Sequence, residues 1–201
     1  MYLEEELKKD ENNCEIIWRL ARGYFNQADC ENERDIKVQY INKSLELVNK
    51  GLEIDPNNAD LLKWWAVTTA GLGDYITAKE KVANAPKIKE YALKSLSIKP
   101  NDTVALFVLG KWAFSVASIS WIERTLANTL FGAVPNATFE EALQYFLDVY
   151  KYDPTFIRNI VSIGDTYLKL SNIEKAKEYF LIAASMTPKS QFEEKFVQEA
   201  K

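Results

Sequence analysis

Hydrophobic residues recur at helical spacing along the chain, most regularly in residues 155–188. Two groups there are spaced by three and four positions: Ile160, Ile163, Gly164 and Tyr167, then Ala176, Phe180 and Ala183. This spacing places each group on one stripe of a helix, so the segment predicts two packed helices. Ser171 and Asn172 predict the tight turn between them. Pro188 ends the second helix, because proline cannot continue it.

The same skeleton recurs upstream, and a proline closes each copy. These prolines are Pro56, Pro100, Pro154 and Pro188. The last two are 34 residues apart, which is the period of a tetratricopeptide repeat. The earlier intervals of 44 and 54 residues predict extra residues between the two helices of each of the first three units. We therefore predict an all-α fold, a tetratricopeptide-like α-solenoid of about four helical hairpins.

This pattern also predicts how the chain is divided. An acidic N-terminal segment or helix covers residues 1–14, the repeat domain covers 15–188, and a capping helix covers 189–201. The repeats are expected at about 15–57, 58–101, 102–154 and 155–188. The capping helix would offer Phe192, Phe196 and Val197 to the last repeat, since the end of a solenoid must be covered.

Small residues predict close contact between the helices of the last repeat. Gly164 and Ala176 would let the two backbones approach, while Tyr167 and Phe180 would fill the remaining space.

The third repeat carries an unusual insertion within Leu109–Phe146. Its first helix is expected to run on past the normal length, because four positions keep helical spacing: Trp112, Val116, Ile119 (or Ser120) and Glu123. Gly132, Pro135 and Asn136 would end this excursion. Thr138, followed three residues later by Glu141, predicts a capping box that starts the next helix.

Three strings in this region carry a family resemblance: Leu109–Trp112 (LGKW), Ala117–Arg124 (ASISWIER) and Leu130–Leu143 (LFGAVPNATFEEAL). Together they resemble the regulator of microtubule dynamics family, tetratricopeptide-like proteins with one long, atypical repeat. The resemblance extends from about Ile16 to Pro188. Pro86 departs from the family pattern, since it interrupts what would be a long second helix.

The resemblance implies five motif residues: Trp112, Trp121, Glu123, Arg124 and Phe131. Aromatic residues at helical spacing usually belong to a core, so the two tryptophans are expected to be buried anchors rather than ligand contacts. The alternative is that Trp112, Trp121 and Phe131 enclose a cavity. Glu123 and Arg124 are adjacent and cannot pair with each other, so each would be satisfied by a loop or a neighbouring helix.

The amino-acid composition limits the kinds of catalytic and metal site that the chain can form. The chain has 201 residues, of which 47% are hydrophobic and 27% charged, with two cysteines and no histidine. Catalytic triads, imidazole proton transfer and His-ligated zinc are therefore excluded, and no cofactor or metal is expected. Two cysteines without ligand spacing are typical of a reduced compartment. The net charge of −4 argues against nucleic acid. Neither a signal peptide nor a transmembrane segment is expected.

Positive charge is concentrated on this acidic chain. Residues 79–99 carry six lysines against two glutamates. The first helices of the repeats should line a concave groove, where we expect a set of basic and aromatic binding residues: Arg19, Lys63, Phe107, Lys111, Phe114, Arg158 and Lys169. Asp60 and Asp165 oppose them. Such a groove favours an acidic peptide or a phosphate-bearing headgroup; the alternative is that these cations form only the solvated side of each helix.

The resemblance implies a non-enzymatic, cytoplasmic protein that acts on tubulin or microtubules in spindle organisation and chromosome segregation. An anionic phospholipid-binding or transfer module, with peripheral association with mitochondrial or endoplasmic reticulum membrane, is the first alternative. A generic scaffold for an acidic peptide is the second. Catalysis is disfavoured, since no nucleotide-binding glycine motif occurs and the carboxylates fall on helix surfaces.

Overall fold

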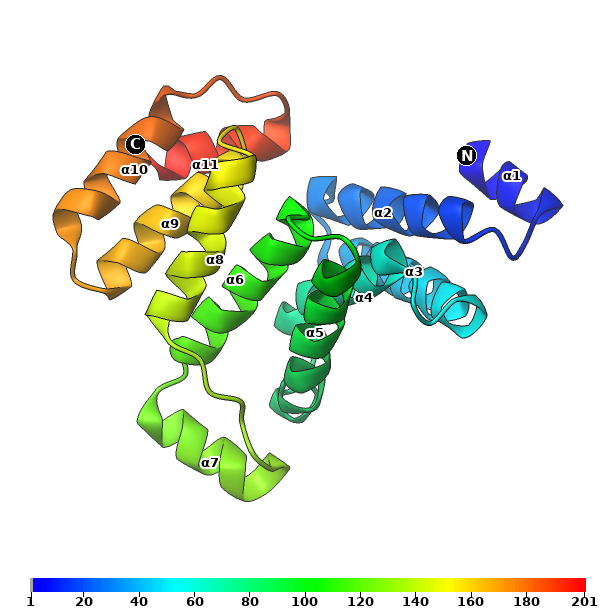
Figure 1. Ribbon diagram of the computed structural model, residues 1–201, viewed down its shortest axis with the longest axis horizontal. Coiled ribbons are helices and arrows are strands. Elements are labelled where there is room, and N and C mark those ends of the chain that lie inside the picture. Colours follow the sequence, from blue (N-terminus) through cyan, green and yellow to red (C-terminus); the bar gives the residue numbers. More distant parts are fainter. Residues whose placement is uncertain (1) are drawn as a thin grey trace. The chain divides into compact units, whose positions relative to one another are not determined.

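The computed structural model describes residues 2–201, and all regular structure in this range is helical (Figure 1). The elements are α1 (Tyr2–Lys9), α2 (Cys14–Cys30), α3 (Arg34–Ile54), α4 (Ala59–Gly71), the 3₁₀ turn η1 (Leu72–Asp74), α5 (Ala78–Ile98), α6 (Thr103–Ala117), α7 (Trp121–Phe131), α8 (Phe139–Tyr152), α9 (Ile157–Lys169), α10 (Ile173–Ser185) and α11 (Gln191–Glu199). The predicted all-α fold class is confirmed.

The chain forms two compact units, one ending at Pro100 and the other beginning at Asn101. The N-terminal unit contains the hairpins α2–α3 and α4–α5, and the C-terminal unit contains α6–α8 and α9–α10. In the C-terminal unit α11 packs on α9 and α10, and its Val197 is buried. The expected capping of the last repeat is confirmed.

The starts of α4 and α6 follow from short polar residues placed two positions after Pro56 and Pro100. The side chain of Asn58 accepts hydrogen bonds from the backbone N–H groups of Asp60 and Leu61 at the start of α4. Asp102 caps α6 in the same way, two residues after Pro100. These caps satisfy N–H groups that have no partner within the helix, so each proline ends one hairpin while the residue behind it starts the next.

Close packing of helix pairs requires glycine at defined positions. A Cβ built on Gly164 of α9 would lie 2.5 Å from the ring of Phe180 on α10, which confirms the predicted close approach. In the N-terminal unit Gly51 packs against Leu61 in the same manner. Both contacts let two helix backbones come closer than any larger side chain would allow.

Pro86 does not interrupt its helix, so that expectation was wrong. Helix α5 is continuous from Ala78 to Ile98 with Pro86 inside it. The proline is exposed. Water can therefore reach the carbonyl that loses its backbone partner, which lowers the cost of proline within a helix.

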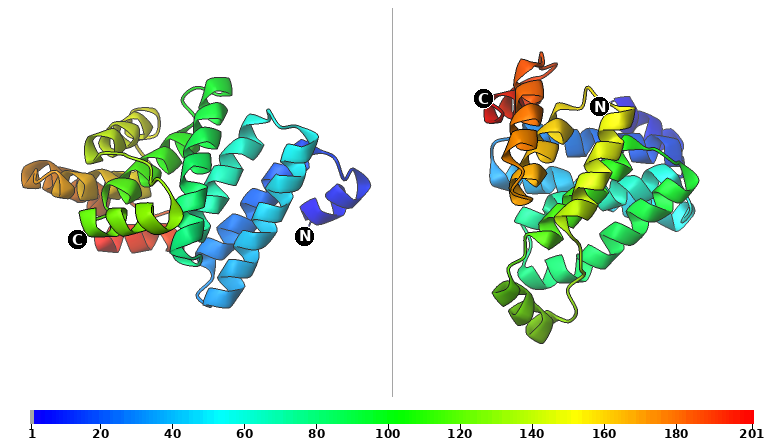
Figure 2. Two further views of the ribbon diagram at one scale, coloured as in Figure 1. Left: turned by 90° about the horizontal axis from the view of Figure 1, so that it is seen from below. Right: turned by 60° about the vertical axis from the view of Figure 1, so that its left-hand side comes forward.

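The predicted extension of the third repeat's first helix was also wrong. Helix α6 ends at Ala117, and α7 starts afresh behind Ser120 at an angle of 99°. A capping box causes the break: the Ser120 hydroxyl accepts from the N–H of Glu123, and the Glu123 carboxylate accepts from Ser120. Figure 1 and the right-hand view of Figure 2 show α7 beyond the ends of α6 and α8.

Within residues 2–201, no single helix is both long enough and apolar enough to cross a bilayer. Helices α6 and α7 reach the necessary length and hydropathy only as a bent pair.

Candidate functional site

In the N-terminal unit, two predicted groove cations meet at one tryptophan. The Arg19 guanidinium lies 4.2 Å from the centre of the Trp18 ring, and Lys63 Nζ lies 5.9 Å from it. Arg19 also pairs with the Glu15 carboxylate and donates to the Glu15 carbonyl at 2.8 Å. Arg19 thus has both an aromatic and an acidic partner within its own helix.

Lys63 belongs to a largely buried ion cluster. Its Nζ lies 2.8 Å from Asp60 Oδ1, and Lys99 pairs with the other Asp60 oxygen. Burial acts to raise the pKa of Asp60, but the hydrogen bonds from Lys63 and Lys99 outweigh it and hold that pKa below its usual range. Lys63 is only 8% exposed. Its charge therefore stabilises the fold locally rather than presenting itself to a ligand.

In the C-terminal unit, Arg158 of α9 is enclosed by aromatic rings. Its guanidinium lies 5.4 Å from the ring centre of Phe107, 5.7 Å from that of Phe192 and 5.6 Å from that of Phe196. Phe107 comes from α6 and the other two rings from the capping helix α11. The structure thus brings Phe107 and Arg158 together, and the capping helix offers Phe192 and Phe196 to the last repeat as expected.

A second part of this unit brings Lys111 and Lys169 near Asp165. Asp165 is exposed, but the protein atoms around it keep part of the solvent away and raise its pKa, and the charges of Lys111 and Lys169 offset this only in part. Lys111 Nζ also lies 5.8 Å from the ring centre of Phe114. We call Lys111, Phe114, Asp165 and Lys169 the α6–α9 face. It offers two ammonium groups around one carboxylate.

Exposed positive charge also lies on α5. Lys79, Lys81 and Lys87 are exposed, and no ion pair within residues 2–201 involves them. The neighbouring Glu80 is held in the capping box of Thr77, whose hydrogen bonds lower the Glu80 pKa. Toward the other end of the helix, Lys94 donates to the Pro56 carbonyl at 3.0 Å. At about 100° per residue, Lys79 and Lys87 lie about 80° apart around α5 and Lys81 lies on another side. We call the three lysines together the α5 basic surface.

The family motif separates into one buried and one exposed tryptophan. Trp112 is 6% exposed, as predicted, but Trp121 is 79% exposed, so the prediction that it is a buried anchor was wrong. Phe131 is 38% exposed. Because α7 is a separate helix, it carries Trp121 and Phe131 away from the core. A tryptophan as exposed as Trp121 cannot line an enclosed cavity.

The charged side chains of Glu123 and Arg124 find hydrogen-bond partners within this region, as the sequence predicted. Glu123 completes the capping box of α7, and the Ser120 hydrogen bonds lower its pKa. Arg124 donates to the backbone carbonyls of Val116 at 2.9 Å and Pro135 at 2.8 Å. It thereby ties the end of α6 to the segment that leads into α8.

Asn128 is a residue of this region that sequence reasoning missed. Its Oδ1 accepts from the N–H of Val134 at 2.8 Å, and so fixes the segment that follows α7. Also missed were three exposed apolar residues of α7: Ile122, Leu126 and Leu130. The Ser120–Glu123 capping box in the sequence was the signal that could have separated α7 from α6.

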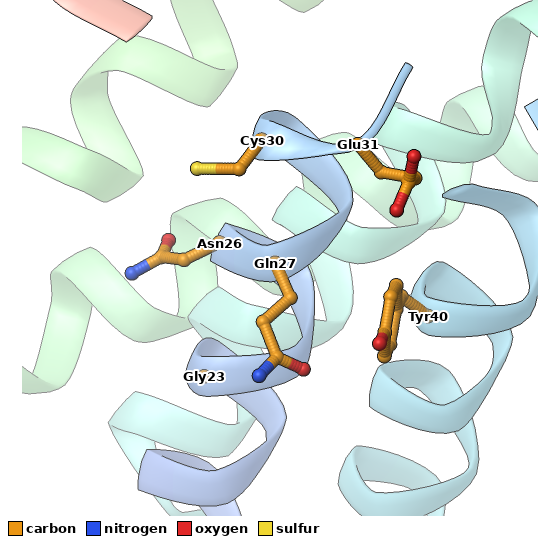
Figure 3. A pocket seen from close by; sticks show the side chains of 6 residues that line it. All are labelled: Gly23, Asn26, Gln27, Cys30, Glu31 and Tyr40. Carbon is orange, nitrogen blue, oxygen red and sulfur yellow. The ribbon is translucent and has the colours of Figure 1, made fainter. Parts of the chain in front are cut away.

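A shallow hollow of about 380 Å³ lies between α2 and α3 (Figure 3). Gln27 and Tyr40 point toward one another from the two helices, whereas Asn26 and Cys30 point away from α3 (Figure 3). The Cys30 thiol is free and exposed. The lining contains a single charged residue, Glu31, so the hollow offers no cationic contact to an acidic ligand.

Solved structures share the fold. MamA aligns with 98% of the chain and 87% of its own length at a TM-score of 0.56 and 17% identity. The tetratricopeptide protein TTC0263 of Thermus thermophilus aligns with 90% of the chain and 80% of its own length at a TM-score of 0.59 and 15% identity. Identities this low bear on the fold alone, and they confirm a tetratricopeptide-like architecture.

Curated relatives carry a more specific likeness. Regulator of microtubule dynamics protein 1 of Mus musculus is 34% identical over 193 residues, covering 94% of this chain and 63% of the relative. The Bos taurus protein is 33% identical over 192 residues, with 94% and 60% covered. The Caenorhabditis elegans protein is 27% identical, with 98% and 88% covered. The chain thus spans about six-tenths of the two mammalian relatives.

The sequence profile of the family described as "Regulator of microtubule dynamics protein 1-3" matches residues 1–201. This match includes the three strings around α7 on which the sequence resemblance was based. The chain therefore belongs to the regulator of microtubule dynamics family.

Proposed function

We propose that this chain is a non-enzymatic microtubule-associated protein that regulates microtubule dynamics in spindle organisation and chromosome segregation. Family membership supports the link to microtubules. The lack of histidine supports a binding role, because it removes the commonest general base. The site of action would be the cytoplasmic cytoskeleton.

The α5 basic surface carries this proposal. On a chain with a net charge of −4, Lys79, Lys81 and Lys87 are exposed cations without a carboxylate partner among the described residues. The acidic tails of tubulin offer the complementary charge. Because the molecule as a whole is acidic, attraction would act only over short range and would weaken as salt rises.

The α6–α9 face supports a second contact with the same acidic partner. Lys111 lies over the Phe114 ring, and both Lys111 and Lys169 interact electrostatically with Asp165. The other groove cations are engaged internally, with Arg19 on Glu15, Lys63 on Asp60 and Arg158 among three phenylalanines. We infer that these three cations stabilise the packing of their own unit instead of contacting the ligand.

Co-pelleting with microtubules tests the proposal. The wild-type chain should pellet with intact microtubules at low salt and lose affinity as salt rises. The double variant Lys79→Glu/Lys87→Glu should bind about tenfold more weakly, since each reversal replaces attraction by repulsion. Lys111→Glu/Lys169→Glu measures the contribution of the α6–α9 face separately. The matched control is Lys177→Glu/Lys195→Glu, which changes exposed lysines of α10 and α11 and gives the same net charge.

Three outcomes decide the matter. Equal binding to microtubules with and without their acidic tails would remove the electrostatic mechanism. Equal weakening by the control pair would show a general charge effect rather than a site. Retained binding in both test variants would exclude the two surfaces named here.

A further inference from the structure

Helix α7 exposes a run of large apolar side chains. Trp121 is 79% exposed, Ile122 72%, Leu126 58% and Leu130 60%, and no residue of α7 is buried. Exposed apolar patches of this kind mark surfaces that contact a partner or a membrane. This patch belongs to the C-terminal unit and is not used by the function proposed above.

The apolar side chains share one half of the helix. At about 100° per residue, an arc of half a turn holds six residues: Trp121, Ile122, Thr125, Leu126, Thr129 and Leu130. None of them is charged. We call these six residues the outer half of α7.

The two threonines in the outer half have satisfied their own hydroxyl groups. Thr125 Oγ1 donates to the Trp121 carbonyl at 2.8 Å, and Thr129 Oγ1 donates to the Thr125 carbonyl at 2.9 Å. Their hydroxyl protons therefore need no water. This is the arrangement required in hydrocarbon, where a polar group without a partner is costly.

The polar groups of α7 that need partners find them within the hairpin. Between Ser118 and Ala137 the charged residues are Glu123 and Arg124. Glu123 closes the capping box, and Arg124 donates to the carbonyls of Val116 and Pro135. Together with Asn128, these contacts hold the helix in place, so that the outer half stays turned outward.

These observations favour a lipid surface over a protein partner. A protein interface normally surrounds its apolar centre with a polar rim that forms hydrogen bonds across the contact, whereas here both charged groups are already engaged internally. Helix α7 is also too short to span a bilayer, and its companion α6 is part of the core, with Leu109 and Ala113 fully buried. The arrangement consistent with these facts is a helix that lies in the plane of the membrane–water interface.

We propose that α7 is a membrane-docking helix, which inserts its outer half into the interfacial region of a lipid bilayer. The insertion is driven by apolar burial, with Trp121 placed at the headgroup level as tryptophans are at membrane interfaces. Because the outer half has no lysine or arginine, docking does not require anionic lipid and is insensitive to salt. This separates it from any binding through the α5 basic surface.

Flotation with vesicles of pure phosphatidylcholine tests the proposal. The wild-type chain should float with the vesicles equally at low and high salt. Ile122→Ser/Leu126→Ser should reduce the bound fraction at least tenfold, because two large apolar contacts are lost. The matched control is Ile173→Ser/Leu181→Ser on α10, whose side chains are 69% and 60% exposed. In a second readout, vesicles should shift the tryptophan emission to the blue in the wild type, and Trp121→Phe should remove that shift.

Several results would overturn the proposal. Flotation restricted to anionic vesicles and abolished by salt would assign binding to the lysines. Equal loss in the α10 control would indicate general adsorption of apolar side chains. Concentration-dependent dimerisation that Ile122→Ser/Leu126→Ser removes, without vesicle binding, would show that a second copy covers α7. Microtubule pelleting should be unchanged in Ile122→Ser/Leu126→Ser, so this test and that of the proposed function fail independently.

Discussion

Gly110 of α6 lies directly against the ring of Phe146 of α8: a Cβ built on Gly110 would stand 2.4 Å from the Phe146 ring. Phe146 is fully buried. The same relationship joins Gly164 to Phe180 in the next hairpin. The two hairpins of the C-terminal unit are therefore closed by the same device, a glycine on the first helix and a phenylalanine ring on the second.

We expect Gly110→Ala to destabilise the protein by about 1–3 kcal/mol, because the added methyl group forces the buried ring or the helices to shift. Urea unfolding followed by tryptophan fluorescence measures this change. The control is Gly23→Ala in α2, where a Cβ meets nothing within 4 Å. That substitution should stabilise by about 0.5–1 kcal/mol, since alanine is the better helix former. Equal stability of the two variants would contradict the packing described.

The Asp60 cluster predicts a loss of stability in acid. Since Lys63 and Lys99 hold the Asp60 pKa below its usual value of 3.8, the carboxylate stabilises the folded state above that value. This contribution is lost as pH falls through the folded-state pKa. Asp60→Asn should cost about 1.5–3 kcal/mol at neutral pH and flatten the dependence of the unfolding free energy on pH between about 5 and 3. Asp74→Asn, at an exposed turn position, should leave that dependence unchanged.

We expect the Arg124 hydrogen bonds to affect the local order of the segment between α6 and α8 rather than the global stability of the protein. Arg124→Gln removes the guanidinium bonds to the Val116 and Pro135 carbonyls, so the segment between α6 and α8 should open more often. Limited proteolysis should then cut within residues 118–138 several-fold faster, while urea unfolding of the core changes by less than about 1 kcal/mol. Arg22→Gln, an exposed arginine of α2, serves as the comparison. Unchanged cleavage in Arg124→Gln would mean that the clamp does not hold α7.

Asp165 predicts how pH affects the α6–α9 face. The protein atoms around it keep part of the solvent away and raise its pKa, and Glu199 adds to this while Lys111 and Lys169 oppose it. Asp165 therefore loses its negative charge at a higher pH than an ordinary aspartate, and the net positive charge of the α6–α9 face then rises. Affinity for a glutamate-rich tubulin-tail peptide, measured by fluorescence anisotropy, should rise as the pH falls toward the raised pKa of Asp165.

The variant Asp165→Asn should bind the same peptide more tightly at neutral pH and lose most of this pH dependence. Glu174→Gln, on the exposed surface of α10, removes the same charge elsewhere and should do neither. An unchanged profile in Asp165→Asn would remove the α6–α9 face from the proposed microtubule contact.

The hairpins were predictable because local signals agree with one another. Pro56 and Pro100 end helices, and Asn58 and Asp102 start the next ones two residues later. Gly164 and Phe180 fall at the spacing that two packed helices need, and the structure places them in contact. In these segments, propensity, capping and hydrophobic period all indicate the same helix pair.

The exposure of α7 was not predictable from its hydrophobic pattern. A stripe of apolar residues shows that one side of a helix is apolar, but not what covers that side. Trp112 and Trp121 therefore appeared equivalent, although the first is in the core and the second on the surface. The prediction that Lys63 binds a ligand was misleading for a similar reason. Its position in α4 does not reveal that Lys63 forms a buried ion pair with Asp60.

Helices α6 and α8 pack directly on each other. The chain between Ala117 and Phe139 leaves this pair, forms α7 and returns to it. Nothing in the α6–α8 contact depends on the length of that excursion, and the entropy of closing a loop grows only slowly with its length. The segment between α6 and α8 can therefore change in length and sequence while the α6–α8 packing is kept. Family members could diverge there in what they attach to, while the same scaffold persists underneath.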